Sequence, residues 1–291
     1  MEQLDGRTAV VTGAASGMGY AFAEAFLGQG MRVVVADVEA PALAAAGERL
    51  AAVGGADAVL TVETDVADPD SVIALRDAAI ERFGRINVLC NNAGVGGVRD
   101  PIGHLDLTDW RWVLGVNLWG VIHGCEAFLP HLLEHGDGHV VNTASIAGHL
   151  SLPFMGPYNV AKHGVVTLSE TMRNELVHAG STVGVSVLCP GFVATRLLDA
   201  DRNRPEHLTR PVAGPDDADA RERERAAGRE LMAQKKPPAE VAELVVDAIR
   251  HDRFWIFTDD QFAEPVAERH RSIEAGTNPV PAKTLVDYLL A

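Results

Sequence analysis

The sequence predicts an α/β fold in which a parallel sheet is covered by helices on both faces. Short apolar runs rich in valine, such as 8–12 and 32–36, alternate along the chain with longer segments of helical pattern. Glycine-rich or polar turns follow several of these runs, at the edge of such a sheet where ligands bind. The length of 291 residues suffices for one large domain or two small ones.

The composition restricts the possible partners. Hydrophobic residues make up 47% and charged residues 22%, which is typical of a soluble globular protein, and the net charge of −15 disfavours nucleic acid and anionic membranes. We expect no membrane span or signal peptide, because we find neither an apolar run of 18 residues nor a basic start followed by an apolar segment. Scattered Cys90, Cys125 and Cys189 indicate reduced thiols in a cytoplasmic protein, and no Cys/His spacing predicts a metal site.

The first strand, 8–12, leads into Gly13-Ala14-Ala15-Ser16-Gly17-Met18-Gly19 and then into a helical pattern over 20–27. Gly13 would allow a tight turn, Gly17 would let a pyrophosphate approach the helix N-terminus, and Gly19 would let the helix pack close to the strand. The alternative is a purely structural turn between strand and helix. The turn predicts a dinucleotide site at Gly13, Ser16, Gly17, Met18 and Gly19.

Asp37 ends the second strand, 32–36, and points to the identity of the dinucleotide. A carboxylate at this position can bond a ribose 2′-hydroxyl and would repel a 2′-phosphate. Positions 14–18 and 38 hold no arginine or lysine that would attract the phosphate. We therefore expect NAD rather than NADP as cofactor. The same carboxylate could instead cap the following helix.

The alternation continues with helix 39–53, strand 57–62, helix 69–83, strand 86–91, helix 106–135, strand 138–143, helix 157–179, strand 183–189, a helix from Pro237-Pro238 to about Arg250, and strand 253–257. Asp65 and Val66 follow the third strand, where the Asp65 carboxylate could accept a hydrogen bond from the adenine amino group. Asn91-Asn92-Ala93-Gly94 forms a turn at the ligand edge. Asn117 lies in mid-helix among apolar residues, so it needs a partner and could distort the helix or bind a water.

The segment 145–162 carries the candidate chemistry. Tyr158 and Lys162 are four residues apart and would share a helix face, with Ser145 shortly before them. A nearby ammonium favours the phenolate, and lowering a phenol pKa by about 3 units needs roughly 4 kcal/mol. Tyr158 would then act as a general acid or base near neutral pH. The alternative is a chance Tyr-x-x-x-Lys on an amphipathic helix.

Together these motifs resemble the short-chain dehydrogenase/reductase family, over roughly residues 5–195 and 238–258. The matching residues are Thr12-Gly13-x-x-x-Gly17-x-Gly19, Asp65, Asn91-Asn92-Ala93-Gly94, Asn117, Ser145, Tyr158-x-x-x-Lys162 and Pro190-Gly191-x-x-x-Thr195. The resemblance implies a single-domain Rossmann fold over 1–291, doubly wound, with a parallel sheet of about seven strands and helices on both faces.

The resemblance also implies roles. Tyr158 would be the general base for alcohol oxidation or the acid for ketone reduction, Lys162 would lower its pKa and hold the nicotinamide ribose, and Ser145 would bond the substrate oxygen. Asn117 would hold a water that relays protons from Lys162. The remaining implied NAD contacts are Asn91, Ala93 and Gly94 at the ribose side, and Pro190, Gly191, Val193 and Thr195 near the carboxamide.

Substrate choice is expected to depend on the charged, proline-containing segment 196–237, which is a lid in the family; its middle could instead be a disordered insertion. Other expected substrate contacts, with Ser145, are His149, Leu152, Phe154, Met155 and Phe192. Their mostly apolar character favours an apolar or mixed-polarity secondary alcohol or ketone, although His149 could be a plain loop residue. The tail 259–291 could pack on a neighbouring subunit, since the family forms homotetramers or homodimers.

The sequence therefore predicts an NAD-dependent alcohol dehydrogenase or ketone reductase of the short-chain type. An epimerase or dehydratase with retained nucleotide is a second possibility, because it shares Ser145, Tyr158 and Lys162. A dinucleotide-sensing protein without catalysis is a third, but it would not require the complete catalytic set. Net turnover of NAD distinguishes the first from the other two.

Overall fold

The computed structural model describes residues 1–209, 226 and 228–289 and contains one parallel sheet. Its strand order is β3-β2-β1-β4-β5-β6-β7, so the direction of winding reverses between β1 and β4. The strands are β1 (Thr8–Thr12), β2 (Arg32–Asp37), β3 (Val59–Glu63), β4 (Val88–Asn91), β5 (His139–Thr143), β6 (Gly184–Cys189) and β7 (Trp255–Phe257). This confirms the predicted doubly wound sheet of seven strands.

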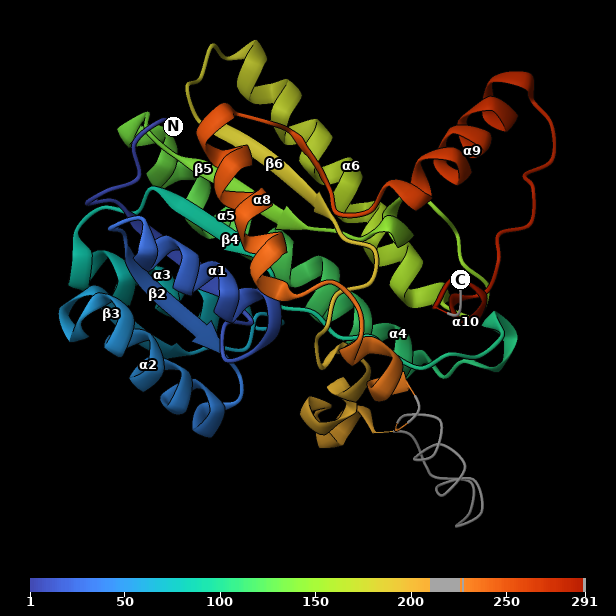
Figure 1. The fold of residues 1–291 in the computed structure, drawn as a ribbon, viewed down its shortest axis with the longest axis horizontal. Coiled ribbons are helices and arrows are strands. Elements are labelled where there is room, and N and C mark those ends of the chain that lie inside the picture. The colour runs from blue at the N-terminus through green and yellow to red at the C-terminus, as the bar shows by residue number, and fades with distance from the viewer. Residues whose placement is uncertain (210–225, 227, 290–291) are drawn as a thin grey trace.

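Helices cover both faces of the sheet (Figure 1). One face packs against α1 (Gly17–Gly28), α2 (Ala40–Gly54) and α8 (Pro238–His251), and the other against α3 (Pro69–Phe83), α5 (Gly120–His135) and α6 (Gly156–His178). Neighbouring residues of one strand serve opposite faces: Val11 belongs to the first core and Val10 to the second. Both faces are therefore buried, which explains the continuous apolar runs in the sequence.

The predicted helix 106–135 is observed as α4 (Leu107–Leu114), a π-helical turn (Gly115–Trp119) and α5. The turn contains Asn117, so the expected local distortion occurs there. Within the described residues, this helix alone is long and apolar enough to cross a membrane by length and composition, but it belongs to the second core, and 44% of its apolar window is buried inside the protein. It is a core helix, as such segments often are.

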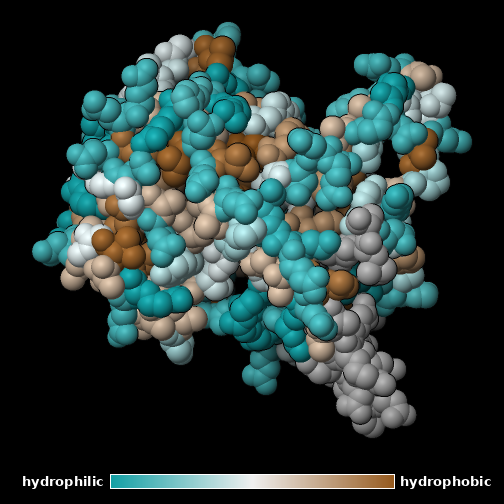
Figure 2. All heavy atoms as spheres, viewed as in Figure 1, coloured by the Kyte–Doolittle hydropathy of each residue, from teal (hydrophilic) through white to brown (hydrophobic). Residues whose placement is uncertain are grey.

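The C-terminal tail contains two helices that the sequence pattern did not predict. α9 (Ala263–Ala275) projects from the body of the molecule and α10 (Leu285–Leu289) folds back beside it (Figure 1). Strand β7 is also shorter than the predicted 253–257, since only its last three residues pair with β6. The visible face is largely hydrophilic, with apolar residues in small separate areas (Figure 2).

The segment 196–237 leaves the sheet after β6 and returns to it before α8. Its ends meet: Val193 pairs with Lys236 in an isolated parallel bridge, and Ala194 N donates to Lys236 O at 2.9 Å. Two 3₁₀ turns, Leu197–Asn203 and Glu206–Leu208, follow the first end. The middle of the predicted lid, 210–225, and residue 227 lie outside the described residues.

Candidate active site

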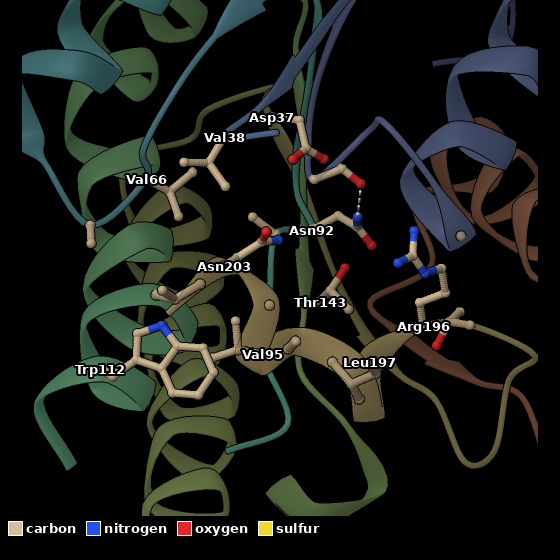
Figure 3. Close-up of a pocket in the computed structure, with 18 of the residues that line it drawn as sticks. Asp37, Val38, Val66, Asn92, Val95, Trp112, Thr143, Arg196, Leu197 and Asn203 are labelled. Carbon is tan, nitrogen blue, oxygen red and sulfur yellow. Dashed lines mark hydrogen bonds between the residues drawn. The ribbon is translucent and has the colours of Figure 1, made fainter. Parts of the chain in front are cut away.

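A cavity of about 430 Å³ lies at the carboxyl ends of the strands, where the winding reverses (Figure 3). It collects most of the side chains and turns that the sequence marked as site residues. Those that line it are Gly13, Ser16, Gly17, Met18, Asp37, Asp65, Val66, Ala93, Gly94, Ser145, Tyr158, Lys162, Pro190, Gly191, Val193 and Thr195.

The turn after β1 forms a cradle that only glycine allows. Gly13 has φ +65°, and a Cβ there would lie 2.7 Å from the Ala93 Cα. A Cβ on Gly19 would lie 2.3 Å from the Gly13 carbonyl oxygen, so α1 begins in direct contact with the turn. Ser16 caps α1 without a side-chain hydrogen bond to the helix. The first backbone N–H groups of α1 are therefore available to an anion such as a pyrophosphate.

Asp37 is fixed at the tip of β2 by two backbone donors. Ala15 N donates to its Oδ2 at 3.0 Å and Glu39 N to its Oδ1 at 3.1 Å. The carboxylate thus joins the glycine turn to the start of α2, whose N-cap is Glu39 rather than Asp37. An acidic group in the cavity beside the anion cradle suits a ribose with free hydroxyls, so these residues fit NAD.

The candidate catalytic side chains come from β5 and α6. Ser145 follows β5 and lies 8% exposed, while Tyr158 and Lys162 are one turn apart on α6 at 8% and 3%. Lys162 Nζ donates to the Thr143 carbonyl at 2.8 Å and lies 5.7 Å from the Tyr158 ring centre. The predicted shared face of Tyr158 and Lys162 is therefore observed, and both side chains line the cavity with Ser145.

Burial controls the ionisation of both groups. Desolvation raises the pKa of Tyr158, although a hydrogen bond with Ser145 opposes the rise. The same effect lowers the pKa of Lys162 to about 8. Our expectation that the Tyr158 pKa is lowered is thus wrong for this structure, because removing the phenolate from water outweighs the influence of the neighbouring groups.

Three predicted residues lie behind the cavity wall. The Asn117 amide pairs with Val95, donating to Val95 O and accepting from Val95 N, both at 2.8 Å. Asn91 turns into the interior, where its Nδ2 donates to Asn142 Oδ1 at 2.9 Å. Gly19 supports the turn but does not line the cavity. Their contribution to a ligand is therefore indirect, through the shape of the loops they hold.

The structure does not bring the other expected substrate residues into the cavity. His149 faces a separate cavity of about 200 Å³, where its Nε2 lies 3.4 Å from Cys189 Sγ and its ring contacts Trp255. Phe154 is half exposed with φ +66°. Leu152, Met155 and Phe192 belong instead to the apolar cluster around the catalytic residues.

Other residues, which sequence reasoning missed, supply the cavity wall. Trp112 comes from α4, and Asn92 follows β4, where its Nδ2 donates to Thr12 O at 3.0 Å. The start of the predicted lid adds further side chains (Figure 3). The missed lining residues include Val38, Asn92 and Trp112. Val95 lies, as expected, in the wall that follows Gly94, and the predicted segment 196–237 supplies Arg196, Leu197, Ala200, Arg202, Asn203, Leu208 and Met232.

The comparisons with known proteins identify the family of the chain. Residues 7–206 match the family model of the short chain dehydrogenases, and the chain belongs to this family. It is 43% identical to a short-chain dehydrogenase/reductase from Burkholderia phymatum solved in complex with NAD, with a TM-score of 0.89 and coverage of 97% of this chain and 99% of that one. Family and fold together define an NAD-binding oxidoreductase of the alcohol dehydrogenase and ketone reductase type.

Two curated relatives are also named dehydrogenases. The chain is 38% identical, over 88% of its length and 86% of the relative's, to 1-deoxy-11-beta-hydroxypentalenate dehydrogenase from Streptomyces avermitilis. It is 38% identical, over 69% of its length and 80% of the relative's, to 2-(R)-hydroxypropyl-CoM dehydrogenase from Xanthobacter autotrophicus.

Proposed function

We propose that this protein interconverts a secondary alcohol and its ketone with NAD(H), using Tyr158 as the general acid or base. The observation that carries the proposal is the meeting of Ser145, Tyr158 and Lys162 in the same cavity as the glycine cradle and Asp37. The cofactor, when bound, supplies the hydride acceptor or donor. The chain's own residues then have to hold the substrate oxygen and move one proton.

The roles follow from position and ionisation. The Tyr158 phenolate takes the alcohol proton during oxidation and becomes the phenol, which returns the proton during reduction, and Ser145, which shares a hydrogen bond with Tyr158, steadies the charge on the substrate oxygen. Lys162 holds the nicotinamide ribose and supplies a positive charge near the phenol ring. Because burial raises the Tyr158 pKa, oxidation should accelerate as the pH rises above neutral, while reduction should be favoured at lower pH.

The cavity wall supports an apolar or mixed-polarity substrate. The lining residues Val95, Trp112, Leu197, Ala200, Leu208 and Met232 are apolar and pack in one cluster with Tyr158, so we place the substrate there. One relative is named for a hydroxypentalenate, which is consistent with a compact, largely hydrocarbon substrate. We further propose that 196–237 acts as a lid, that the protein is a cytoplasmic homotetramer or homodimer, and that the tail 259–291 packs on a neighbouring subunit.

The test is nicotinamide absorbance with NAD against secondary alcohols of graded size, from small aliphatic to terpenoid and steroid. We expect a rise in absorbance with at least one compact apolar alcohol and a smaller rise with NADP. If NAD binds but no alcohol or ketone reacts, the alcohol dehydrogenase proposal is wrong. Interconversion of epimers without net change in NAD would then indicate the epimerase alternative.

A further inference from the structure

Glu39 and Arg202, which are far apart in the sequence, meet at the edge of the cavity. Arg202 donates to Glu39 Oε1 from Nε at 3.0 Å and from Nη2 at 2.5 Å. Asn203 Nδ2 donates to the same oxygen at 2.8 Å. The first 3₁₀ turn after β6 is thereby tied to the residue that begins α2. Both partners are only partly exposed, Arg202 at 27% and Glu39 at 23%.

The contact between Glu39 and Arg202 lies beside Asp37, the residue expected to bind the ribose hydroxyls. Asp37, Val38 and Glu39 line the cavity from one side, and Arg196, Arg202 and Asn203 line it from the segment that crosses it; Figure 3 labels Asp37, Val38 and Asn203 around the same space. Asp37 is held by the backbone N–H of Glu39. Any group attached to the ribose hydroxyls near Asp37 would therefore be close to both Glu39 and Arg202.

Arg202 is fully engaged in this arrangement. Two of its nitrogens bind Glu39, and its Nη1 donates to the Asp199 carbonyl at 2.9 Å. The Arg202 guanidinium in turn holds the pKa of Glu39 below its usual range, so the carboxylate stays charged. The positive charge that could attract a 2′-phosphate is thus neutralised by a negative one.

We propose that Glu39 is a second determinant of the preference for NAD over NADP, acting through Arg202. Asp37 repels the 2′-phosphate directly, while Glu39 prevents Arg202 from binding it. Removal of Asp37 alone leaves Arg202 neutralised and the Glu39 carboxylate in place. Removal of both acidic charges leaves a fixed guanidinium, with Arg196 on the same cavity, facing the site of the phosphate.

The test measures dissociation constants of NADH and NADPH by fluorescence titration, without any substrate, so it does not depend on the proposed reaction. The variants are Asp37→Ser, Glu39→Gln, the double variant, and the double variant with Arg202→Ala. Gln at position 39 keeps the shape and an acceptor oxygen for Arg202. Glu48→Gln, on the same helix but away from the cavity, controls for net charge, and a thermal melting curve like that of the wild type shows that each variant folds.

We expect Asp37→Ser alone to tighten NADPH binding by less than about tenfold, and the added Glu39→Gln to tighten it by at least about a further tenfold. Adding Arg202→Ala should cancel that second gain. An unchanged NADPH constant on adding Glu39→Gln would overturn the proposal. So would a gain that survives without Arg202, because Glu39 would then act only by its own repulsion.

Discussion

The side-chain amide of Asn117 forms a two-way pair with the backbone of Val95, with both hydrogen bonds at 2.8 Å. The pair joins the π-helical turn between α4 and α5 to the loop that follows β4. That loop carries Ala93 and Gly94, which line the cavity. Asn117 therefore shapes the cofactor side of the site from behind, while its expected role in a water relay stays a prediction.

Asn117→Ala should lower the free energy of unfolding by about 2–4 kcal/mol, because it leaves a buried N–H and a buried carbonyl of Val95 without partners. NAD binding should weaken as well, since the loop bearing Gly94 loses its support. Thermal melting and NADH titration measure both effects. Asn278→Ala, in the exposed tail, is the control and should change stability by less than about 0.5 kcal/mol. Equal melting curves for the two variants would contradict the structural role of Asn117.

Tyr158→Phe should reduce turnover by at least about a hundredfold, because it removes the only atom of this side chain that can transfer a proton. The NADH dissociation constant should stay within about twofold, since the ring that lines the cavity remains. Tyr20→Phe is a matched control: its hydroxyl lies 3.5 Å from Glu24 Oε1 on α1, outside the cavity. Turnover comparable to wild type in Tyr158→Phe would remove Tyr158 from the mechanism.

Because of Lys162, the free energy of unfolding should increase with pH in the alkaline range. Burial lowers its pKa from 10.5 to about 8, so between these values the unfolded chain binds more protons than the folded one. Below pH 8 the buried Lys162 ammonium lowers the free energy of unfolding by its full desolvation penalty. As the pH rises towards 10.5 the folded protein loses this proton first, and the penalty disappears. Relative to Lys162→Met, the wild type should gain about 2 kcal/mol of unfolding free energy from pH 8 to 9.5.

Denaturant titration at several pH values measures this difference. The Met variant keeps a long side chain but cannot titrate, so common changes cancel between the two proteins. A constant difference across this range would show that the folded protein does not depress the Lys162 pKa.

The segment 197–209, the start of the proposed lid, should open when Arg204 is replaced. Its ion pair with Asp109, at 2.7 Å, is nearly buried, and its guanidinium also lies 5.1 Å above the Trp112 ring. Arg204→Met removes this nearly buried ion pair, and breaking such a pair costs about 3–5 kcal/mol. Hydrogen exchange and proteolysis over 197–209 should therefore accelerate, whereas cofactor plus substrate should slow them.

Arg271→Met is the control for the loss of an arginine. Its pair with Glu264 is exposed on α9, at 58% and 77%, and such pairs contribute about 0–1 kcal/mol. If both variants exchange equally fast over 197–209, Arg204 does not hold this segment.

The sequence predicted the sheet well because each central strand is a short valine-rich run, buried on both faces, that ends in a polar or glycine turn. The shared face of Tyr158 and Lys162 and the glycine turn after β1 were predictable for a related reason: both arrangements depend on local spacing, along one helix or in one turn. The helix α9 was missed because its sequence is polar, although Pro265 near its start and Gly276 after its end are boundary signals that could have indicated it.

The substrate wall was less predictable. His149 follows Ser145 closely in sequence, yet its ring is drawn towards Trp255 and Phe257 of the edge strand, away from the cavity. Leu197 and Met232 reach the cavity only because the chain after β6 crosses it. Such contacts depend on how distant segments pack, and no local pattern encodes that packing. The same holds for the Tyr158 pKa, which depends on burial.

Because Val193 and Lys236 form a bridge, the segment between them can be treated as a loop that is replaceable by another sequence. The two ends of the segment lie side by side, because Val193 and Lys236 pair as neighbouring strand residues. A replacement segment therefore needs only to connect two points that are already close together. Doubling the length of such a loop costs only about 0.6 kcal/mol in closure entropy. Other segments can therefore be grafted after Asn203 and before Lys236 to vary the proposed lid, while the glycine turn, Thr195, the contact between Glu39 and Arg202, and Tyr158 stay unchanged.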